Sequence, residues 1–266
     1  MNFITIFADN VKPVKLCGTG TFNPHKTAIV DEHLSCIHQK DVNIWFYRKN
    51  DTIIAIDSGY HTENSFFEDL KTLKIINDDI KAVFLTHGDV DHMGGLLSKN
   101  RFAKNAKVYL NEKEESMILG TAKRFGKGFI KIKNPVKFTG EYEVFKDNAE
   151  IFIENVKIQT FLCCGHTKGH TCYLFDDKYL FTGDSIAVNE NGGHCFFNFY
   201  NMDTKESILS LNKLKNKLKD NPPSVICTSH NGIASFEDGF SKIDTVAKAS
   251  KSKPFDKTGP YDVFKD

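Results

Sequence analysis

The chain has 266 residues, of which 40% are apolar and 26% charged, the composition of a globular protein large enough to bury a substantial core. Its 35 lysines and arginines nearly balance 34 aspartates and glutamates, so we expect neither nucleic acid nor a membrane surface as a partner. The seven cysteines include no Cys-x-x-Cys pair and favour reduced thiols over a disulfide framework or a zinc finger.

The first residues, MNFITIFADNVK, predict a β-strand rather than a secretory signal peptide. No basic region precedes their short apolar run, and Asp9 interrupts it. No apolar run in the sequence approaches the roughly 18–20 residues that are needed to cross a bilayer. We therefore expect a soluble, cytoplasmic protein that folds as a single domain over residues 1–266.

Short β-rich runs follow along the chain and alternate with helical patterns. Polar turns at Arg48–Asp51 and Asp176–Lys178 join neighbouring runs and predict two β-hairpins. Hairpins mixed with strand–helix alternation indicate two mixed β-sheets with helices outside them, an α/β or α+β sandwich rather than a purely parallel sheet. The runs are FITIF, VNIWFYR, TIIAID, AVFLT, AKVYL, VKIQTFL, TCYLF, KYLFT and SVICT.

Three segments predict helices, at residues 62–73, 203–218 and 236–249. The second is the clearest, because Asp203 begins a capping-box-like sequence and apolar residues then recur at the helical period. Gly239 weakens the third pattern. The apolar positions of the first two helices are Phe66, Phe67, Leu70 and Leu73, and Ile208, Leu211, Leu214 and Leu218.

The polar residues with the most chemical potential stand where apolar strands end. A rigid scaffold commonly holds binding residues on such loops, and a sandwich that brings these strand ends to one edge would converge four loops on one pocket. Polar loops also follow strands without any function, but that explanation poorly fits four metal-capable side chains within six residues. The candidates are His87, Asp89, Asp91 and His92 after AVFLT, His166 and His170 after VKIQTFL, Asp184 after KYLF, and His230 after SVI.

Imidazoles and carboxylates in this combination point to metal-assisted chemistry. They suit zinc, iron, manganese, nickel or cobalt, and the lack of a required thiolate argues against a closed structural zinc site. Side chains alternate in direction along an extended backbone, so His87 and Asp89 can face one point while the turn presents Asp91 and His92 to another. Two metal ions roughly 3.5–4 Å apart that share a carboxylate and a hydroxide form the two-metal pattern of hydrolases.

The sequences THGDVDHMGG, GHTKGHT, FTGDS and SHNG, in this order, resemble the motifs of the metallo-β-lactamase superfamily. That superfamily includes β-lactamases, glyoxalase II thioesterases, lactonases and flavodiiron oxygen reductases. The resemblance spans roughly residues 43–232 and includes an IDSG segment that contains Asp57. It implies a four-layer αββα sandwich of two mixed β-sheets flanked by helices.

The resemblance also implies roles for individual residues. Asp91 and His92 would act in catalysis, and Asp57 would stand behind the ligands and orient one of them. His170 matches a position that is not normally a ligand and is assigned to the same supporting shell. The implied ligands are His87 and His166 for a first metal ion, Asp91, His92 and His230 for a second, and Asp184 as a bridge.

Asp89 departs from the pattern, because the superfamily usually has a histidine there. The carboxylate could bind the first metal ion and shift its preference from zinc towards iron or manganese. Alternatively, the first site is weak and loses its ion, or Asp89 only stands beside the ligands. The flavodiiron branch has a carboxylate at this position, but this chain lacks the flavodoxin domain of those proteins.

The function that these residues favour is hydrolysis of a small-molecule substrate. A metal-bound hydroxide would attack an ester, thioester, lactone or lactam, using two divalent ions, with zinc expected and iron or manganese as alternatives. A di-iron oxidoreductase and a non-catalytic metal-binding module are the competing hypotheses. The aromatic segment around His194 could wall a substrate pocket, although core packing is the favoured interpretation, as it is for Cys163 and Cys164.

Overall fold

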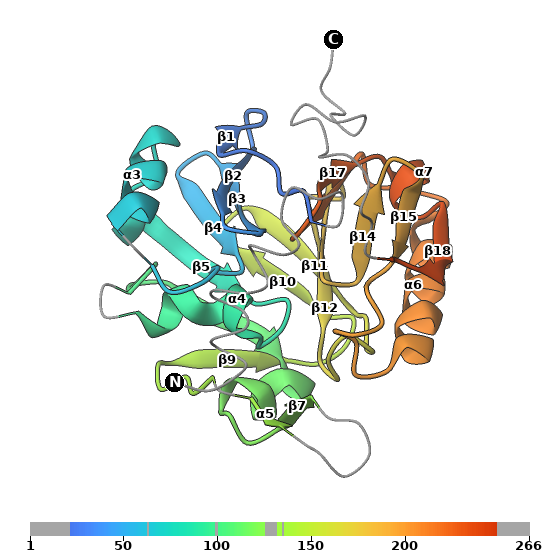
Figure 1. Cartoon of the computed structure of the whole chain (residues 1–266). Coiled ribbons are helices and arrows are strands. Elements are labelled where there is room, and N and C mark those ends of the chain that lie inside the picture. The colour runs from blue at the N-terminus through green and yellow to red at the C-terminus, as the bar shows by residue number, and fades with distance from the viewer. Residues whose placement is uncertain (1–21, 63, 99–100, 126–131, 135, 249–266) are drawn as a thin grey trace.

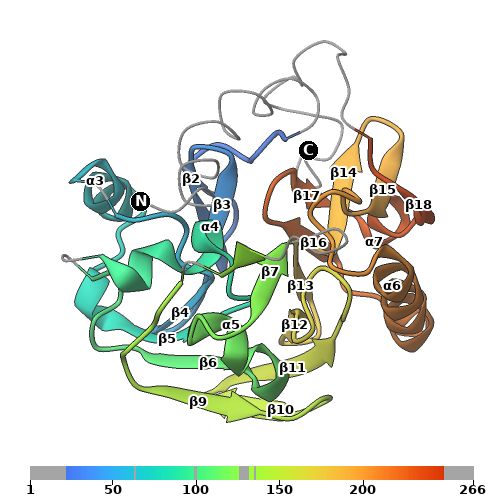
Figure 2. The same cartoon turned by 60° about the horizontal axis from the view of Figure 1, so that its bottom comes forward.

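The structure is a computed structural model that describes residues 22–248, except 63, 99–100, 126–131 and 135. Two large mixed β-sheets pack face to face, with helices on their outer faces (Figures 1 and 2). The first sheet has the order β1 (Ala28–Ile29), β2 (Leu34–Gln39), β3 (Val42–Lys49), β4 (Thr52–Ile56), β5 (Ile80–Phe84), β6 (Lys107–Asn111) and β9 (Tyr142–Phe145). The second has the order β10 (Glu150–Ile153), β11 (Val156–Leu162), β12 (Thr171–Phe175), β13 (Tyr179–Gly183), β16 (Val225–Thr228) and β17 (Gly232–Ala234).

Smaller elements surround the two sheets. Within the described residues, no helix is both long enough and apolar enough to cross a membrane. A three-stranded sheet contains β14 (Ile186–Asn189), β15 (Gly192–Cys195) and β18 (Lys242–Val246), and β7 (Lys123–Phe125) pairs with β8 (Ile132–Lys133). The α-helices are α3 (Asn64–Thr72), α4 (Val90–Met93), α5 (Glu115–Ile118), α6 (Thr204–Leu218) and α7 (Phe236–Gly239), and the 3₁₀ turns are η2 (Asn77–Asp79), η3 (Gly94–Leu97) and η4 (Glu112–Glu114).

Three apolar layers hold this sandwich together. One lies between the first sheet and the helices outside it, and includes Phe66 and Leu70 of α3. A second lies between the two sheets, where Phe84 meets Tyr173. The third lies between the second sheet and α6, and includes Leu211. Helix, sheet, sheet and helix therefore form four layers, which confirms the fold class that the sequence predicts.

Local sequence explains the best-formed elements. The Asp203 carboxylate caps α6 by accepting hydrogen bonds from the backbone amides of Lys205 and Glu206 at 3.0 and 3.1 Å. Both predicted hairpins form, since β3 pairs with β4 and β12 with β13 in antiparallel fashion. Asn50 and Asp177 take positive φ angles of 52° and 56° in these turns, as tight turns require.

The prediction of a third helix over residues 236–249 is wrong. Only Phe236–Gly239 is helical, and the chain then forms β18 (Lys242–Val246), which runs parallel to β15. The backbone of Gly239 packs closely against Gly193 of β15, and β-branched residues follow it, so tertiary packing overrides the weak helical pattern. The predicted strand FITIF lies outside the described residues.

Strand direction brings the polar loops to one edge of the sandwich. Strand β4 runs parallel to β5, and β13 runs parallel to β16, so the carboxyl ends of each pair lie together. Backbone hydrogen bonds then join the loops across the two sheets. The amide of Thr171 donates to the carbonyl of Thr86 at 2.9 Å, and the amide of Asn43 donates to that of Ser229 at 2.7 Å.

Candidate metal centre

Side chains from the loops after β5, β11, β13 and β16 converge at this edge. Their metal-capable atoms form three overlapping groups, and within each group the donor atoms lie within 4.8 Å of one another. The structure thus brings together all seven residues for which the sequence predicts metal binding. The groups are His87, Asp89 and His166 (the first cluster), Asp91, His92 and His230 (the second cluster), and His87, His92 and Asp184 between them.

Each histidine of the second cluster is held by its outer ring nitrogen. His92 Nδ1 donates to Asp57 Oδ2 at 2.8 Å, and His230 Nδ1 donates to the backbone carbonyl of Asp41 at 2.5 Å. Such bonds fix both the orientation and the tautomer of an imidazole. The two Nε2 atoms consequently face Asp184 Oδ1, at 3.4 Å from His92 and 3.2 Å from His230.

The histidines of the first cluster are oriented in the same way. The Thr86 hydroxyl donates to Asp57 Oδ2 at 2.8 Å, so its oxygen accepts from His87 Nδ1 at 2.9 Å. Asn201 Oδ1 accepts from His166 Nδ1 at 3.2 Å. With their outer nitrogens engaged, His87 and His166 turn their Nε2 atoms towards each other at 3.1 Å.

Asp57 and His170 lie directly behind these ligand candidates. Asp57 has a positive φ of 62°, an uncommon backbone conformation for a non-glycine residue, and also accepts from the Thr86 amide at 2.8 Å. His170 Nε2 accepts from the Asp184 amide at 3.1 Å, so its Nδ1 carries the proton and donates to Ser185 Oγ at 3.1 Å. Burial lowers the pKa of His170 well below its ordinary value, which keeps the ring neutral in this position.

The second cluster and Asp184 together have the properties of a cation site. Among the described residues, the buried side-chain atoms without a hydrogen-bond partner include His92 Nε2, His230 Nε2 and Asp184 Oδ1. An unsatisfied buried polar atom costs about 1–3 kcal/mol, so three that face one another indicate a site built for a ligand. Burial lowers the pKa of His92, but the Asp184 and Asp57 carboxylates outweigh burial and raise it well above its ordinary value. This donor set and its negative charge fit a divalent metal ion.

Asp89, the departure from the superfamily pattern, pairs with Arg124 of β7. The guanidinium Nε lies 2.6 Å from Asp89 Oδ1, and Nη2 lies 2.6 Å from Oδ2. Burial alone would raise the pKa of Asp89, but Arg124, His166 and His87 together outweigh burial and hold that pKa well below its ordinary value. Burial, together with Arg124, lowers the pKa of His166 to about 4, so this imidazole is neutral.

Glu114 also belongs to the site, although no motif in the sequence marks it. Its carboxylate is fully buried and accepts from the Gly88 amide at 2.8 Å, the Thr167 hydroxyl at 2.8 Å and the Gly169 amide at 2.9 Å. Burial raises the pKa of Glu114, while the Thr167 hydroxyl and the Gly88 amide oppose the change. The residue therefore joins the loop after β5 to the loop between β11 and β12, which carry the first cluster.

Replacing Glu114 with glutamine should lower the free energy of unfolding by about 1–3 kcal/mol. Each carboxylate oxygen accepts a backbone amide, so the amide nitrogen of glutamine would face an N–H group whichever way the side chain turned. Chemical denaturation measures the change. Glu112→Gln is the matched control, because Glu112 is exposed nearby, and it should shift stability by less than about 0.5 kcal/mol. Equal stability of the two variants would contradict the linking role of Glu114.

The aromatic side chains that follow β15 mainly pack in the apolar interior. Phe196 and Phe197 are 1% and 7% exposed and belong to a small apolar cluster, whereas Phe199 is 65% exposed. His194 lies on β15, where its Nδ1 is 2.7 Å from the hydroxyl of Thr245 in β18. His194 does not join any of the metal-capable groups found among the described residues.

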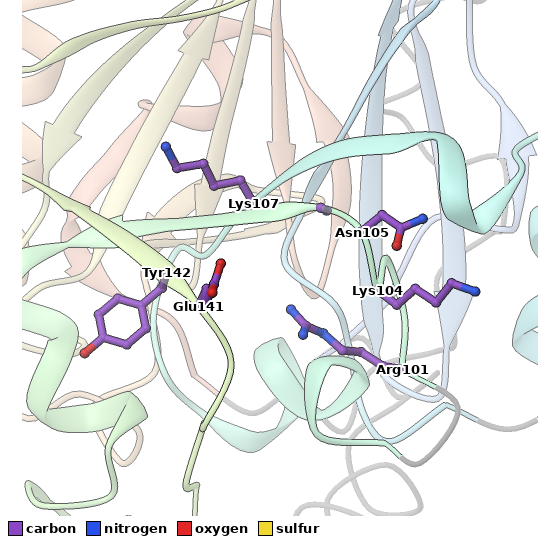
Figure 3. Close-up of a pocket in the computed structure, with 7 residues that line it drawn as sticks. Arg101, Lys104, Asn105, Lys107, Glu141 and Tyr142 are labelled. Carbon is purple, nitrogen blue, oxygen red and sulfur yellow. The ribbon is translucent and has the colours of Figure 1, made fainter.

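A separate hollow lies beside the start of β6 (Figure 3). Its lysines are exposed and paired with carboxylates, since Lys104 lies 2.8 Å from Asp78 and Lys107 pairs with Glu143. None of the predicted site residues lines it, so we assign it to the solvated surface. The lining residues are Arg101, Lys104, Asn105, Ala106, Lys107, Glu141 and Tyr142.

Comparison with known proteins agrees with this arrangement. A family model described as the metallo-beta-lactamase superfamily matches residues 39–230. The chain is 27% identical to the probable metallo-hydrolase YybB of Bacillus subtilis, over 71% of this chain and 80% of that protein. It is 28% identical to the hydroxyacylglutathione hydrolase of Buchnera aphidicola subsp. Schizaphis graminum, over 72% of this chain and 62% of that protein.

Solved structures show the same fold. The Rm3 metallo-beta-lactamase aligns with a TM-score of 0.57 and 16% identity, over 80% of each chain. A beta-lactamase from Chitinophaga pinensis aligns with a TM-score of 0.58 and 20% identity, over 78% of this chain and 79% of that chain.

Proposed function

Because this chain belongs to the metallo-beta-lactamase superfamily, we propose that it is a metal-dependent hydrolase that cleaves an ester, thioester, lactone or lactam bond of a small molecule. One observation carries the proposal. Three buried atoms that could bind a metal ion face one another and have no hydrogen-bond partner among the described residues. They are His92 Nε2, His230 Nε2 and Asp184 Oδ1. The two curated relatives compared above are named as hydrolases, which supports the same reaction class.

Asp91, His92, His230 and Asp184 are the residues that would hold the metal ion. A divalent ion bound there supplies a Lewis acid that polarises a carbonyl oxygen and lowers the pKa of water towards neutrality. The protein contributes the orientation of the donors, since Asp57 fixes the ring of His92 from behind.

Asp91 is the group to which we assign proton transfer to the leaving group. Its side chain is buried, and Oδ2 lies 3.7 Å from His92 Nε2 and 3.6 Å from His230 Nε2. A carboxylate in this place can accept the proton that the attacking water gives up and pass it to the leaving group when the bond breaks.

Cysteine chemistry is a poor alternative to this mechanism. The adjacent Cys163 and Cys164 stand close to the His166 loop, but Cys163 is buried and its pKa is raised well above the ordinary value, chiefly by its contact with Cys172. Cys164 donates its thiol proton to the carbonyl of Lys168 at 3.0 Å, and burial raises its pKa. Only a thiolate is an effective nucleophile, and both environments favour the thiol.

The di-iron alternative depended on Asp89 as a metal ligand. Because Arg124 engages both carboxylate oxygens, that carboxylate is committed to an ion pair, and no other feature of the site favours iron. Elemental analysis of protein purified without added metal tests this choice. Colourless protein with zinc supports hydrolysis, whereas iron with visible absorption that changes on reduction would support the oxidoreductase.

Hydrolysis itself is tested with a panel of ester, thioester, lactone and nitrocefin-type lactam substrates. We expect turnover of at least one class, its loss when EDTA removes the metal ion, and its return when Zn²⁺ is restored. Chelation should not unfold the protein, because its core lies in three apolar layers apart from the metal candidates. Turnover that persists after complete removal of the metal would contradict the proposed mechanism.

A further inference from the structure

Arg124 occupies an unusual position for an arginine. Its side chain is 1% exposed and reaches the first cluster from β7, which is not one of the strands that carry the superfamily motifs. Besides its two contacts with Asp89, Nη2 lies 3.0 Å from His166 Nε2 and donates to the carbonyl of Tyr200 at 2.7 Å. The guanidinium is thus fixed by partners from three segments of the chain.

These contacts place a positive charge among the donor atoms of the first cluster. Arg124 Nη2 is close to both Asp89 Oδ2 and His166 Nε2, two of the atoms that would bind an ion there. Since His166 Nδ1 points to Asn201, the lone pair on Nε2 is the acceptor for Nη2. A zinc ion needs its nitrogen ligands at about 2.0–2.1 Å, so it could not share that lone pair with the guanidinium.

Charge leads to the same result. The Arg124 guanidinium forms a bidentate ion pair with Asp89, the one carboxylate of the first cluster, so a cation already stands beside this carboxylate. A divalent ion added beside the guanidinium would meet like charge in a buried place, where such repulsion is weakly screened. The second cluster differs, because His92 Nε2 and His230 Nε2 have no hydrogen-bond partner among the described residues.

We propose that the Arg124 guanidinium takes the place of the first metal ion, so that the chain binds one divalent ion, at the second cluster with Asp184. The proposal departs from the two-ion expectation drawn from the motifs. This inference rests on the proposed function, because it assumes that the second cluster binds a metal ion.

The test is the number of ions per folded chain. Protein dialysed against excess Zn²⁺ and then freed of unbound metal is analysed by native mass spectrometry and by elemental analysis. The wild-type chain should hold one ion. Arg124→Met removes the cation but keeps an unbranched side chain, so the first cluster should become available and the metal content should double.

Two controls separate the effect of Arg124 from a general effect of losing an ion pair. Lys49→Met removes the cation that lies 2.8 Å from Asp176, away from the metal candidates, and should leave one ion per chain. Arg124→Lys keeps the positive charge and should also leave one ion.

The histidine variants keep the proposal testable if Arg124→Met does not fold. In the otherwise wild-type chain, His166→Ala should retain its ion, whereas His230→Ala should lose it. Two ions in the wild-type chain, a folded Arg124→Met that still holds one, or loss of the ion from His166→Ala would overturn the proposal. A wild-type chain that binds no metal at all would instead overturn the proposed function, so the two failures are distinguishable.

Discussion

Asp184→Asn is expected to lower the affinity for a divalent metal ion by at least about a hundredfold and to abolish hydrolysis. Partners that merely orient a ligand contribute about 10–100-fold in metal affinity, and Asp184 stands among the ligands themselves. Its Oδ1 faces the Nε2 atoms of His92 and His230, and an amide would bring no charge to balance the ion. Burial raises the pKa of Asp184, but these histidines outweigh burial and hold that pKa well below its ordinary value. The change to asparagine therefore removes a full negative charge from the site.

Zn²⁺ titration calorimetry measures the affinity, and elemental analysis measures the metal content after dialysis. The control is Asp51→Asn, which makes the same chemical change in the exposed turn between β3 and β4 and should alter neither quantity. Circular dichroism of the metal-free Asp184→Asn protein should match that of the metal-free wild type, which shows that the variant is folded. Metal content equal to that of wild type would favour a site that does not depend on Asp184 and would count against the proposed function.

Phe84→Ala should lower the free energy of unfolding by about 3–5 kcal/mol, the usual cost of truncating a fully buried aromatic residue. Phe84 is 0% exposed and lies between the two sheets. Its ring stacks on Tyr109 with centroids 4.7 Å apart and meets Tyr173 edge-on at 5.3 Å. The cavity left by alanine would sit in the layer that holds the sandwich together, just before the loop that carries His87.

Thermal and chemical denaturation measure this effect. For a protein of this size, 1 kcal/mol corresponds to about 2–4 °C in Tm, so the expected fall is about 6–20 °C. Phe152→Ala is the control, because Phe152 is 60% exposed on β10 and its loss should change stability by less than about 0.5 kcal/mol. A similar loss in both variants would mean that the layer between the sheets is not what stabilises the fold.

The sequence supports the layered fold and the convergence of the loops because both follow from local patterns. Apolar runs that end in histidine or aspartate mark strand ends, and their order along the chain identifies the superfamily. Helix α6 could be predicted equally well, because the Asp203 cap and the apolar stripe both indicate a helix over these residues. The last predicted helix failed because pairing with β15, a long-range contact, decided the structure of residues 242–246.

The surroundings of Asp89 could not be predicted in the same way. Arg124 lies 35 positions further along the chain, in a short strand without a motif, and only the folded structure shows that it reaches the cluster. One signal was present in the sequence. The chain has only three arginines, Arg48, Arg101 and Arg124, and arginine is the side chain suited to a buried bidentate ion pair, so each of the three is a candidate partner for Asp89. No comparable feature of the sequence marks Glu114.

The bidentate pair between Arg124 and Asp89 also constrains how this protein can diverge. A histidine at position 89 would leave a buried guanidinium without its carboxylate, and a neutral side chain at position 124 would leave a buried carboxylate without its cation. Either single change should therefore be selected against, and the two positions should vary together. Among homologues of this chain, we expect arginine at the second position to accompany aspartate at the first, and the superfamily's usual histidine to occur where that arginine is absent.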